Sequence, residues 1–414
     1  MYADQTPFFY LGDTAWELFH RLNREEVDAY LTDRAHKGFT VIQAVVLAEL
    51  DGLNTPNPYG HTPLIENDPT RPNPAYFEHV DYIVNKAEEL GIFIGMLPTW
   101  GDKFNKKWGV GPVCFTPENA LVYGRYLGQR YKNKPIIWIL GGDRSPEEPQ
   151  HFEIIRAMAT GLKEGDDGRN LMTYHPMGGA CSADWFHNDA WLDFNMFQSG
   201  HSRANEHNHN KTLAVRMKTP TKPVLDGEPR YEDHPIDWKP ENGWFDDWDV
   251  RQAAYWSMLC GAAGHTYGNH NIWQMWQPGR GPISSARTPW KTAVGHPGSQ
   301  QMGHMRRLFE SLDWQSLEPY QAILKNDGGN GAGHIRAALS THAGFALVYT
   351  PMGKTIELEL GDWTGMNIQA SWFNPRNGRK TEIGPFKIDN LHTFQPPSNG
   401  RGNDWLLILQ RQEG

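Results

Sequence analysis

Two carboxylic acids stand at the ends of apolar runs in this chain. Asp143 follows the run 136–142, and Glu228 follows the run 223–227. Runs of this kind are typical of strands buried on both faces of a parallel sheet, and such strands deliver the next residue to the carboxyl edge. Two carboxyl groups that face one pocket can cleave a glycosidic bond, one as proton donor and the other as nucleophile or activator of water.

The spacing of the two acids predicts that they meet. Asp143 and Glu228 lie 85 positions apart, and a βα unit of an eight-stranded barrel takes roughly 31 residues, so the separation is about three units. This places the acids after strands four and seven, across the barrel mouth from each other. We expect desolvation to raise the pKa of Asp143, and Arg230 to help keep Glu228 ionised.

Each acid also has an alternative interpretation. A carboxylate at a strand end often caps the next helix or pairs with an arginine, and Asp143 could open a helix through the following residues 144–146. Asp226 lies two residues before Glu228, so in a strand the two side chains point to the same face. Asp226 could therefore be the catalytic acid in place of Glu228.

Further polar and aromatic residues follow the expected strands at the same edge. Because ligands bind at the carboxyl ends of barrel strands, we expect these residues to contact the substrate. The expected substrate-binding residues from strand ends are Asp13, Trp16, Trp100, His175, Gln198, Tyr267 and Trp273. A structural role is the alternative for Asp13, and a core position is the alternative for each tryptophan.

Composition and known motifs exclude several other classes of function. The net charge of −9 without a basic cluster argues against a nucleic-acid partner, and no apolar run approaches the ~20 residues of a membrane span. We expect no metal and no cofactor, because His201, His207 and His209 occupy a polar, loop-like stretch typical of surface histidines. No serine-nucleophile elbow or phosphate-binding glycine loop is present.

Eight apolar runs that alternate with helical patterns predict a (β/α)₈ TIM barrel over residues 1–317. The expected strands are 8–12, 40–47, 92–97, 136–140, 171–174, 194–198, 223–225 and 264–267. The helix expected between strands five and six has the weakest pattern. Short strands at 334–340, 345–349, 355–360, 368–373 and 405–410 then predict a small antiparallel β-sandwich over residues 318–414.

Neither the compartment nor the oligomeric state follows from these residues. Residues 1–8 lack the charged and apolar regions of a signal peptide. We expect a secreted or periplasmic protein if a leader has been removed, and a cytoplasmic one otherwise. Three cysteines allow at most one disulfide, so the fold is not a disulfide scaffold.

Four segments together resemble glycoside hydrolase family 140, the apiosidase-like enzymes. They are residues 7–19 (PFFYLGDTAWELF), 41–43 (VIQ), 138–143 (WILGGD) and 226–229 (DGEP). The resemblance implies a barrel followed by a β-sandwich, with Asp143 as acid/base, Glu228 as nucleophile and Gln43 among the substrate-binding residues. The short β-segment that usually precedes the first motif is reduced here to residues 1–6. Relatives carry a last domain labelled collagen-binding, for which we expect a packing role.

The sequence thus predicts a retaining exo-glycosidase. By resemblance, its substrate is terminal apiose on plant cell-wall pectin side chains or on apiosylated glycosides. Retention predicts carboxyl groups ~5–5.5 Å apart, whereas ~6.5–9.5 Å indicates inversion. The alternatives are another exo-furanosidase, such as an arabinofuranosidase, and a non-catalytic carbohydrate-binding protein.

Overall fold

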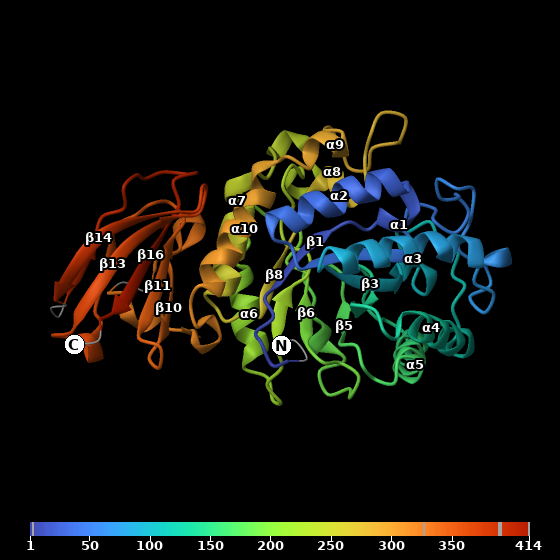
Figure 1. The fold of residues 1–414 in the computed structure, drawn as a ribbon, viewed down its shortest axis with the longest axis horizontal. Helices are drawn as coiled ribbons and strands as arrows, with labels where there is room; N and C mark the ends of the chain where they lie inside the picture. Colours follow the sequence, from blue (N-terminus) through green and yellow to red (C-terminus); the bar gives the residue numbers. More distant parts are fainter. Residues whose placement is uncertain (2–3, 326–327, 388–390, 413–414) are drawn as a thin grey trace.

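The first three quarters of the chain form a barrel of parallel strands with helices around it (Figure 1). The computed structural model describes residues 1, 4–325, 328–387 and 391–412. The barrel strands are β1 (Tyr10–Thr14), β2 (Val41–Leu47), β3 (Phe93–Thr99), β4 (Ile136–Gly141), β5 (Met172–His175), β6 (Asn195–Phe197), β7 (Val224–Asp226) and β8 (Gly264–Tyr267). All eight coincide with expected strands, with ends shifted by up to two residues.

Backbone hydrogen bonds close the ring of strands. One sheet runs β5-β4-β3-β2-β1-β8, and β6 and β7 pair separately. The Asp193 N–H donates to the Met172 carbonyl (2.9 Å) beside β6, and the Ala263 N–H donates to the Val224 carbonyl (2.9 Å) of β7. These contacts join the pair to β5 and β8, so the predicted TIM barrel is confirmed.

Helices surround the barrel, and their ends follow local sequence signals. They are α1 (Leu18–Arg21), α2 (Arg24–Lys37), α3 (Pro74–Glu89), α4 (Pro117–Tyr131), α5 (Pro149–Gly165), α6 (Asn208–Arg216), α7 (Asp247–Met258), α8 (His270–Trp273), α9 (Trp290–Ala293) and α10 (Pro297–Glu310). Asn23 and Glu26 form a capping box at α2, and Gly38 ends it in the left-handed region. Between β5 and β6 a single turn, Ser182–Asp184, replaces the helix with the weak pattern.

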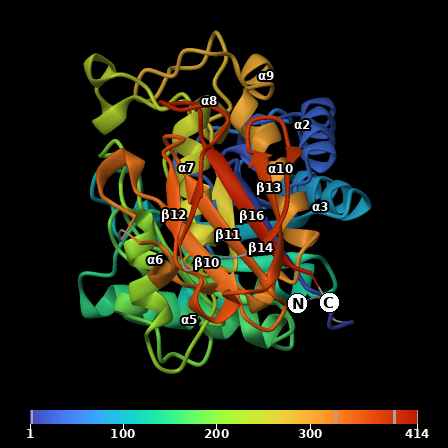
Figure 2. The same ribbon diagram turned by 90° about the vertical axis from the view of Figure 1, so that its left-hand side faces the viewer.

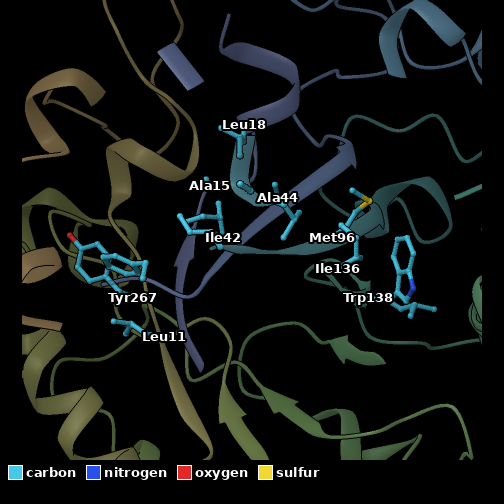
Figure 3. Packing of buried hydrophobic residues seen from close by; sticks show 14 of the residues in the cluster. Leu11, Ala15, Leu18, Ile42, Ala44, Met96, Ile136, Trp138 and Tyr267 are labelled. Carbon is cyan, nitrogen blue, oxygen red and sulfur yellow. The ribbon is translucent and has the colours of Figure 1, made fainter. Parts of the chain in front are cut away.

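Alternating strand residues build two separate cores. In β2, Val41 and Val45 face the barrel interior, whereas Ile42 and Ala44 pack beneath the helices. Figure 3 shows part of the outer core, with Ala44 of β2 beside Met96 of β3. This alternation decides which residues at the carboxyl ends of the strands can point into the mouth of the barrel. No helix in the described part of the chain has the length and apolar character that a membrane span requires.

Antiparallel sheets follow the barrel and confirm the predicted β-rich second part (Figures 1 and 2). One sheet has the order β14-β13-β16-β11-β10-β9, and β12 pairs with β15. The strands are β9 (Glu318–Pro319), β10 (Arg336–Ser340), β11 (Phe345–Thr350), β12 (Ile356–Leu358), β13 (Asn367–Asn374), β14 (Arg379–Lys387), β15 (His392–Phe394) and β16 (Trp405–Arg411). The sequence analysis missed β9, β14 and β15. The cluster between the sheets includes Trp363, Trp372 and Leu407.

A buried ion pair joins the two parts. Arg251 of α7 donates two hydrogen bonds to Asp404, at 2.9 and 2.8 Å, and both side chains are almost fully buried. Nearby, Trp248 donates to the Pro351 carbonyl (2.8 Å) and Gln252 donates to the Ala332 carbonyl (2.8 Å). Since α7 belongs to the barrel and its partners belong to the β-rich part, the interface is specific and desolvated.

Replacing Arg251 with alanine is expected to lower the free energy of unfolding by about 3–5 kcal/mol, because Asp404 then stays buried without its cation. Urea unfolding of the full chain measures the change. The control is Arg125→Ala, which removes a half-exposed pair with Glu164 and is expected to cost less than about 1 kcal/mol. Equal effects of the two substitutions would contradict the role assigned to the buried pair.

Candidate active site

A cavity of about 710 Å³ opens at the carboxyl ends of the barrel strands, and both predicted acids line it. Asp143 follows β4 and Glu228 follows β7. The wall between them includes Trp16, Trp100, Gln198 and Trp273. The described residues contain no group of three or more His, Cys, Asp or Glu side chains placed to hold a metal ion.

A tight turn after β4 positions Asp143. Gly141, Gly142 and Asp143 have φ values of 95°, 91° and 53°. A Cβ on Gly141 would lie 2.3 Å from the His175 carbonyl oxygen, and one on Gly142 would lie 2.9 Å from the Gly101 nitrogen. The two glycines are therefore required both by conformation and by close packing. The left-handed backbone of Asp143 is uncommon for a non-glycine residue and is a feature of many functional sites.

The surroundings of Asp143 favour its protonated form. Burial is the main cause and the charge on Glu228 adds to it, and together they raise the pKa of Asp143 to about 7. Arg144 and His175 oppose the shift, and so does a hydrogen bond with Gln198. Because burial wins, Asp143 carries a proton over the slightly acidic range in which a general acid needs one.

The surroundings of Glu228 favour its ionised form instead. Burial by itself would raise its pKa, but the His175 and His201 side chains that face its two oxygens outweigh this and lower the pKa to about 2. His201 Nε2 lies 2.9 Å from Oε1, and His175 Nε2 lies 3.1 Å from Oε2. Two acids with pKa values pushed apart in one cavity match a division into proton donor and anionic group.

His175 contacts both acids. Its Nδ1 accepts the Asp143 backbone N–H (3.3 Å), so its proton is on Nε2, which lies 3.1 Å from Glu228 Oε2. Arg230, expected near Glu228, instead donates to Gln252 Oε1 (2.9 Å). The expectation of an arginine partner for Glu228 was wrong, and histidines take that place.

Asp226, the alternative acid, lies outside the cavity lining. It is fully buried at the end of β7 and faces outward, accepting from Ser199 Oγ (2.6 Å) and Asn208 Nδ2 (3.2 Å). Burial raises its pKa to about 6 despite these hydrogen bonds. Asn208 belongs to α6, and Asp226 is absent from the cavity lining, so Asp226 has a structural place here and Glu228 faces the cavity.

Strand parity also explains why two expected substrate-binding residues do not reach the cavity. Asp13 lies two residues after Leu11 on β1, so its side chain points to the same side of the strand as Leu11, toward the outer core. It accepts from Tyr30 (2.6 Å) and pairs with the buried guanidinium of Arg34. Tyr267 likewise faces outward and donates to Glu232 Oε2 (2.5 Å). Asp13 therefore connects the barrel to α2, and Tyr267 connects β8 to the loop after β7.

The other expected substrate-binding residues either line the cavity or support residues that line it. Trp16, Trp100, Gln198 and Trp273 line the cavity, and His175 lies fully buried behind Glu228. Gln43 points into the barrel interior, where it accepts from Tyr10 Oη (3.1 Å) and donates to the Gly227 carbonyl (3.1 Å). Gln43 thus braces the residue before Glu228 and is itself fully buried.

Several cavity residues were not selected from the sequence. They are Trp108, Tyr231, His234, Trp238 and His270. Most belong to long loops after strands, so their distance in sequence from a strand end concealed them. Glu49, a strand-end residue after β2, also lines the cavity, and its pKa is raised by burial and by neighbouring acids. His201 and His209 are buried, which corrects the expectation of surface histidines.

Two family models match the chain. The one described as "Apiosidase-like, catalytic domain" matches residues 1–316, and the one described as "Putative collagen-binding domain of a collagenase" matches residues 319–410. No curated protein matches the chain.

Solved structures are similar over the full length. A glycoside hydrolase family 5 protein from Bacteroides vulgatus ATCC 8482 has a TM-score of 0.90 and 33% sequence identity, covering 99% of this chain and 91% of that one. A second structure, titled "Glycoside hydrolase", has a TM-score of 0.88 and 33% identity, covering 99% of this chain and 94% of that one.

Proposed function

This chain belongs to the apiosidase-like family and is a glycoside hydrolase, and from that premise we propose that it releases terminal apiose with retention of configuration. The proposed substrates are pectin side chains of plant cell walls or apiosylated glycosides. The observation that carries the proposal is the pair of buried carboxyls in one cavity, with the pKa raised at Asp143 and lowered at Glu228. The resemblance of four segments to glycoside hydrolase family 140 and the match to the apiosidase-like family model support the choice of sugar.

In the proposed first step, Glu228 attacks the anomeric carbon and forms a glycosyl ester. The bond to the leaving oxygen breaks, and Asp143 transfers its proton to that oxygen. In the second step, Asp143, now a carboxylate, takes a proton from water as the water attacks the same carbon and frees Glu228. Each acid ends the cycle in the protonation state that its surroundings favour.

The histidines have a supporting role in this scheme. His175 and His201 face the two oxygens of Glu228 and stabilise its negative charge before attack. His175 also holds the Asp143 backbone through Nδ1. It is therefore proposed as a positioning residue that fixes the two carboxyls relative to each other.

A panel of nitrophenyl furanosides and pyranosides tests the sugar preference, and proton NMR of the first product tests the stereochemistry. We expect the highest kcat/KM on the apiofuranoside and a first product with the anomeric configuration of the substrate. Preference for arabinofuranoside would replace the proposed sugar but keep the mechanism. An inverted first product would refute the nucleophile role of Glu228, and binding without hydrolysis of any substrate would refute the catalytic assignment.

We also propose that the chain divides into a catalytic barrel over residues 1–317 and a β-sandwich over residues 318–414. The first antiparallel strand, β9, begins at Glu318, and the two matched regions meet between residues 316 and 319. The desolvated interface around Arg251 supports a packing role for the second part.

A further inference from the structure

Two exposed tryptophans lie on the rim of the cavity. Trp108 is 58% exposed and Trp238 is 50% exposed, whereas Trp16, Trp100 and Trp273 are each at most 8% exposed. A large apolar side chain gains little from folding when half of it stays in water. Exposed aromatic surface beside a cavity therefore indicates contact with a ligand.

Trp108 rests against a buried arginine, and Lys107 Nζ also lies 5.8 Å from the centre of its ring. The Arg144 guanidinium carbon lies 4.0 Å from the centre of its ring, close enough for a cation–π contact. Arg144 is fully buried, and it donates to the carbonyls of Asn105 (3.0 Å), Asp143 (2.7 Å) and Lys106 (3.4 Å). Because these carbonyls fix the guanidinium, the indole rests on a rigid support while much of its surface remains open.

The position of this support relates Trp108 to the proton donor. Arg144 directly follows Asp143, and its NH1 lies 3.4 Å from Asp143 Oδ2. A general acid delivers its proton to the glycosidic oxygen, which departs with the leaving group. The leaving group must therefore lie on the Asp143 side of the cavity, where Trp108 stands.

Trp238 lies on the Glu228 side of the cavity. Its ring lies edge-on to His201, with centroids 6.0 Å apart, and His201 contacts Glu228. Asp237 and Trp238 both have positive φ, 56° and 58°, and the Asp237 N–H donates to the His201 carbonyl (2.9 Å). Such backbone is costly for non-glycine residues and persists where surrounding contacts impose it. The two indoles thus flank the two acids.

We propose that Trp108 is the stacking platform for the first sugar ring of the leaving group. This inference rests on the proposed function and adds a leaving-group subsite to it. The C–H face of a sugar ring buries apolar area against the indole, and Arg144 keeps the indole at the height of the proton donor. The site thereby favours a glycoside whose leaving group is another sugar over one with a small alkyl group.

The test compares two substrates in the full-length enzyme: methyl apioside and an apiosyl galacturonide, in which the leaving group is a pectin sugar. Trp108→Ala is expected to lower kcat/KM on the galacturonide about tenfold more than on the methyl glycoside. Trp108→Phe is expected to restore part of that difference. Trp238→Ala is expected to affect both substrates alike, because it flanks the other acid.

Tyr320→Ala is the control, since this half-exposed aromatic lies in the β-rich part, away from the cavity, and both rates are expected to match wild type. An equal loss on the two substrates in Trp108→Ala would overturn the subsite, because it would indicate a role only in supporting Arg144. Equal wild-type rates would overturn it as well.

If wild type cleaves neither substrate, the proposed function fails while the subsite remains testable. Calorimetric titration with galacturonic acid then decides: weaker binding to Trp108→Ala than to wild type supports the platform, and equal or undetectable binding overturns it.

Discussion

Replacing Glu228 with glutamine is expected to lower kcat by about three orders of magnitude or more, because the neutral amide can neither attack the anomeric carbon nor stabilise developing positive charge. Glutamine keeps the volume, and its carbonyl oxygen can still accept a hydrogen bond from one of the two histidines, so the fold is expected to persist. Steady-state rates on the preferred nitrophenyl glycoside measure the loss, and circular dichroism verifies the fold.

Glu206→Gln is the matched control, since Glu206 also lines the cavity but lies outside the proposed catalytic pair, and a change of only a few-fold is expected. In Glu228→Ala, added azide is expected to restore turnover and yield a glycosyl azide, because the small anion occupies the space of the lost carboxylate. Near-normal activity in Glu228→Gln would refute the nucleophile assignment.

The second large effect concerns Asp143 and pH. Since the pKa of Asp143 is about 7 and the acid must be protonated to act, kcat/KM is expected to fall as the pH rises through about 7. Asp143→Asn is expected to remove this alkaline limb. Its loss in kcat/KM, which reports the first step alone, is expected to be about a thousandfold for a sugar leaving group, which needs the proton, and small for dinitrophenolate, which does not.

His201→Gln is the matched control, because it tests the acidic limb of the pH profile, which the pKa of Glu228 determines. The His201 side chain helps to lower the pKa of Glu228 to about 2, so its loss is expected to move the acidic limb to higher pH and leave the alkaline limb in place. An alkaline limb that survives near pH 7 in Asp143→Asn would show that another group is the proton donor. Glu49, with its raised pKa and its place on the cavity wall, would be the first to examine.

The barrel was predictable because buried parallel strands leave continuous apolar runs, and all eight runs became strands. The edge strand β14 was missed because most of its residues are polar and exposed. A strand of this kind carries little hydrophobic pattern, although its charges protect the sheet edge. The sequence thus indicated the central strands of each sheet better than the outer ones.

The placement of the two acids in one cavity was also predictable, since strand order determines it. The partners of those acids were not, because they depend on which way each strand-end side chain turns. Asp13 and Tyr267 have outward parity, and one residue of register decides between substrate contact and helix packing. His201 comes from a loop whose path no periodicity encodes, whereas His175 ends β5 and was selected, but as a substrate contact and not as a partner of Glu228.

The buried pair between Arg251 and Asp404 bears on how this enzyme could be shortened or recombined. Cutting the chain after the barrel would leave the Arg251 guanidinium, the Trp248 and Trp256 indole N–H groups and the Gln252 amide without their acceptors. A minimal catalytic version would need that surface redesigned first. For the same reason, a β-rich part taken from a relative would fit this barrel only if it carried an aspartate and carbonyl groups at the positions that accept hydrogen bonds from α7.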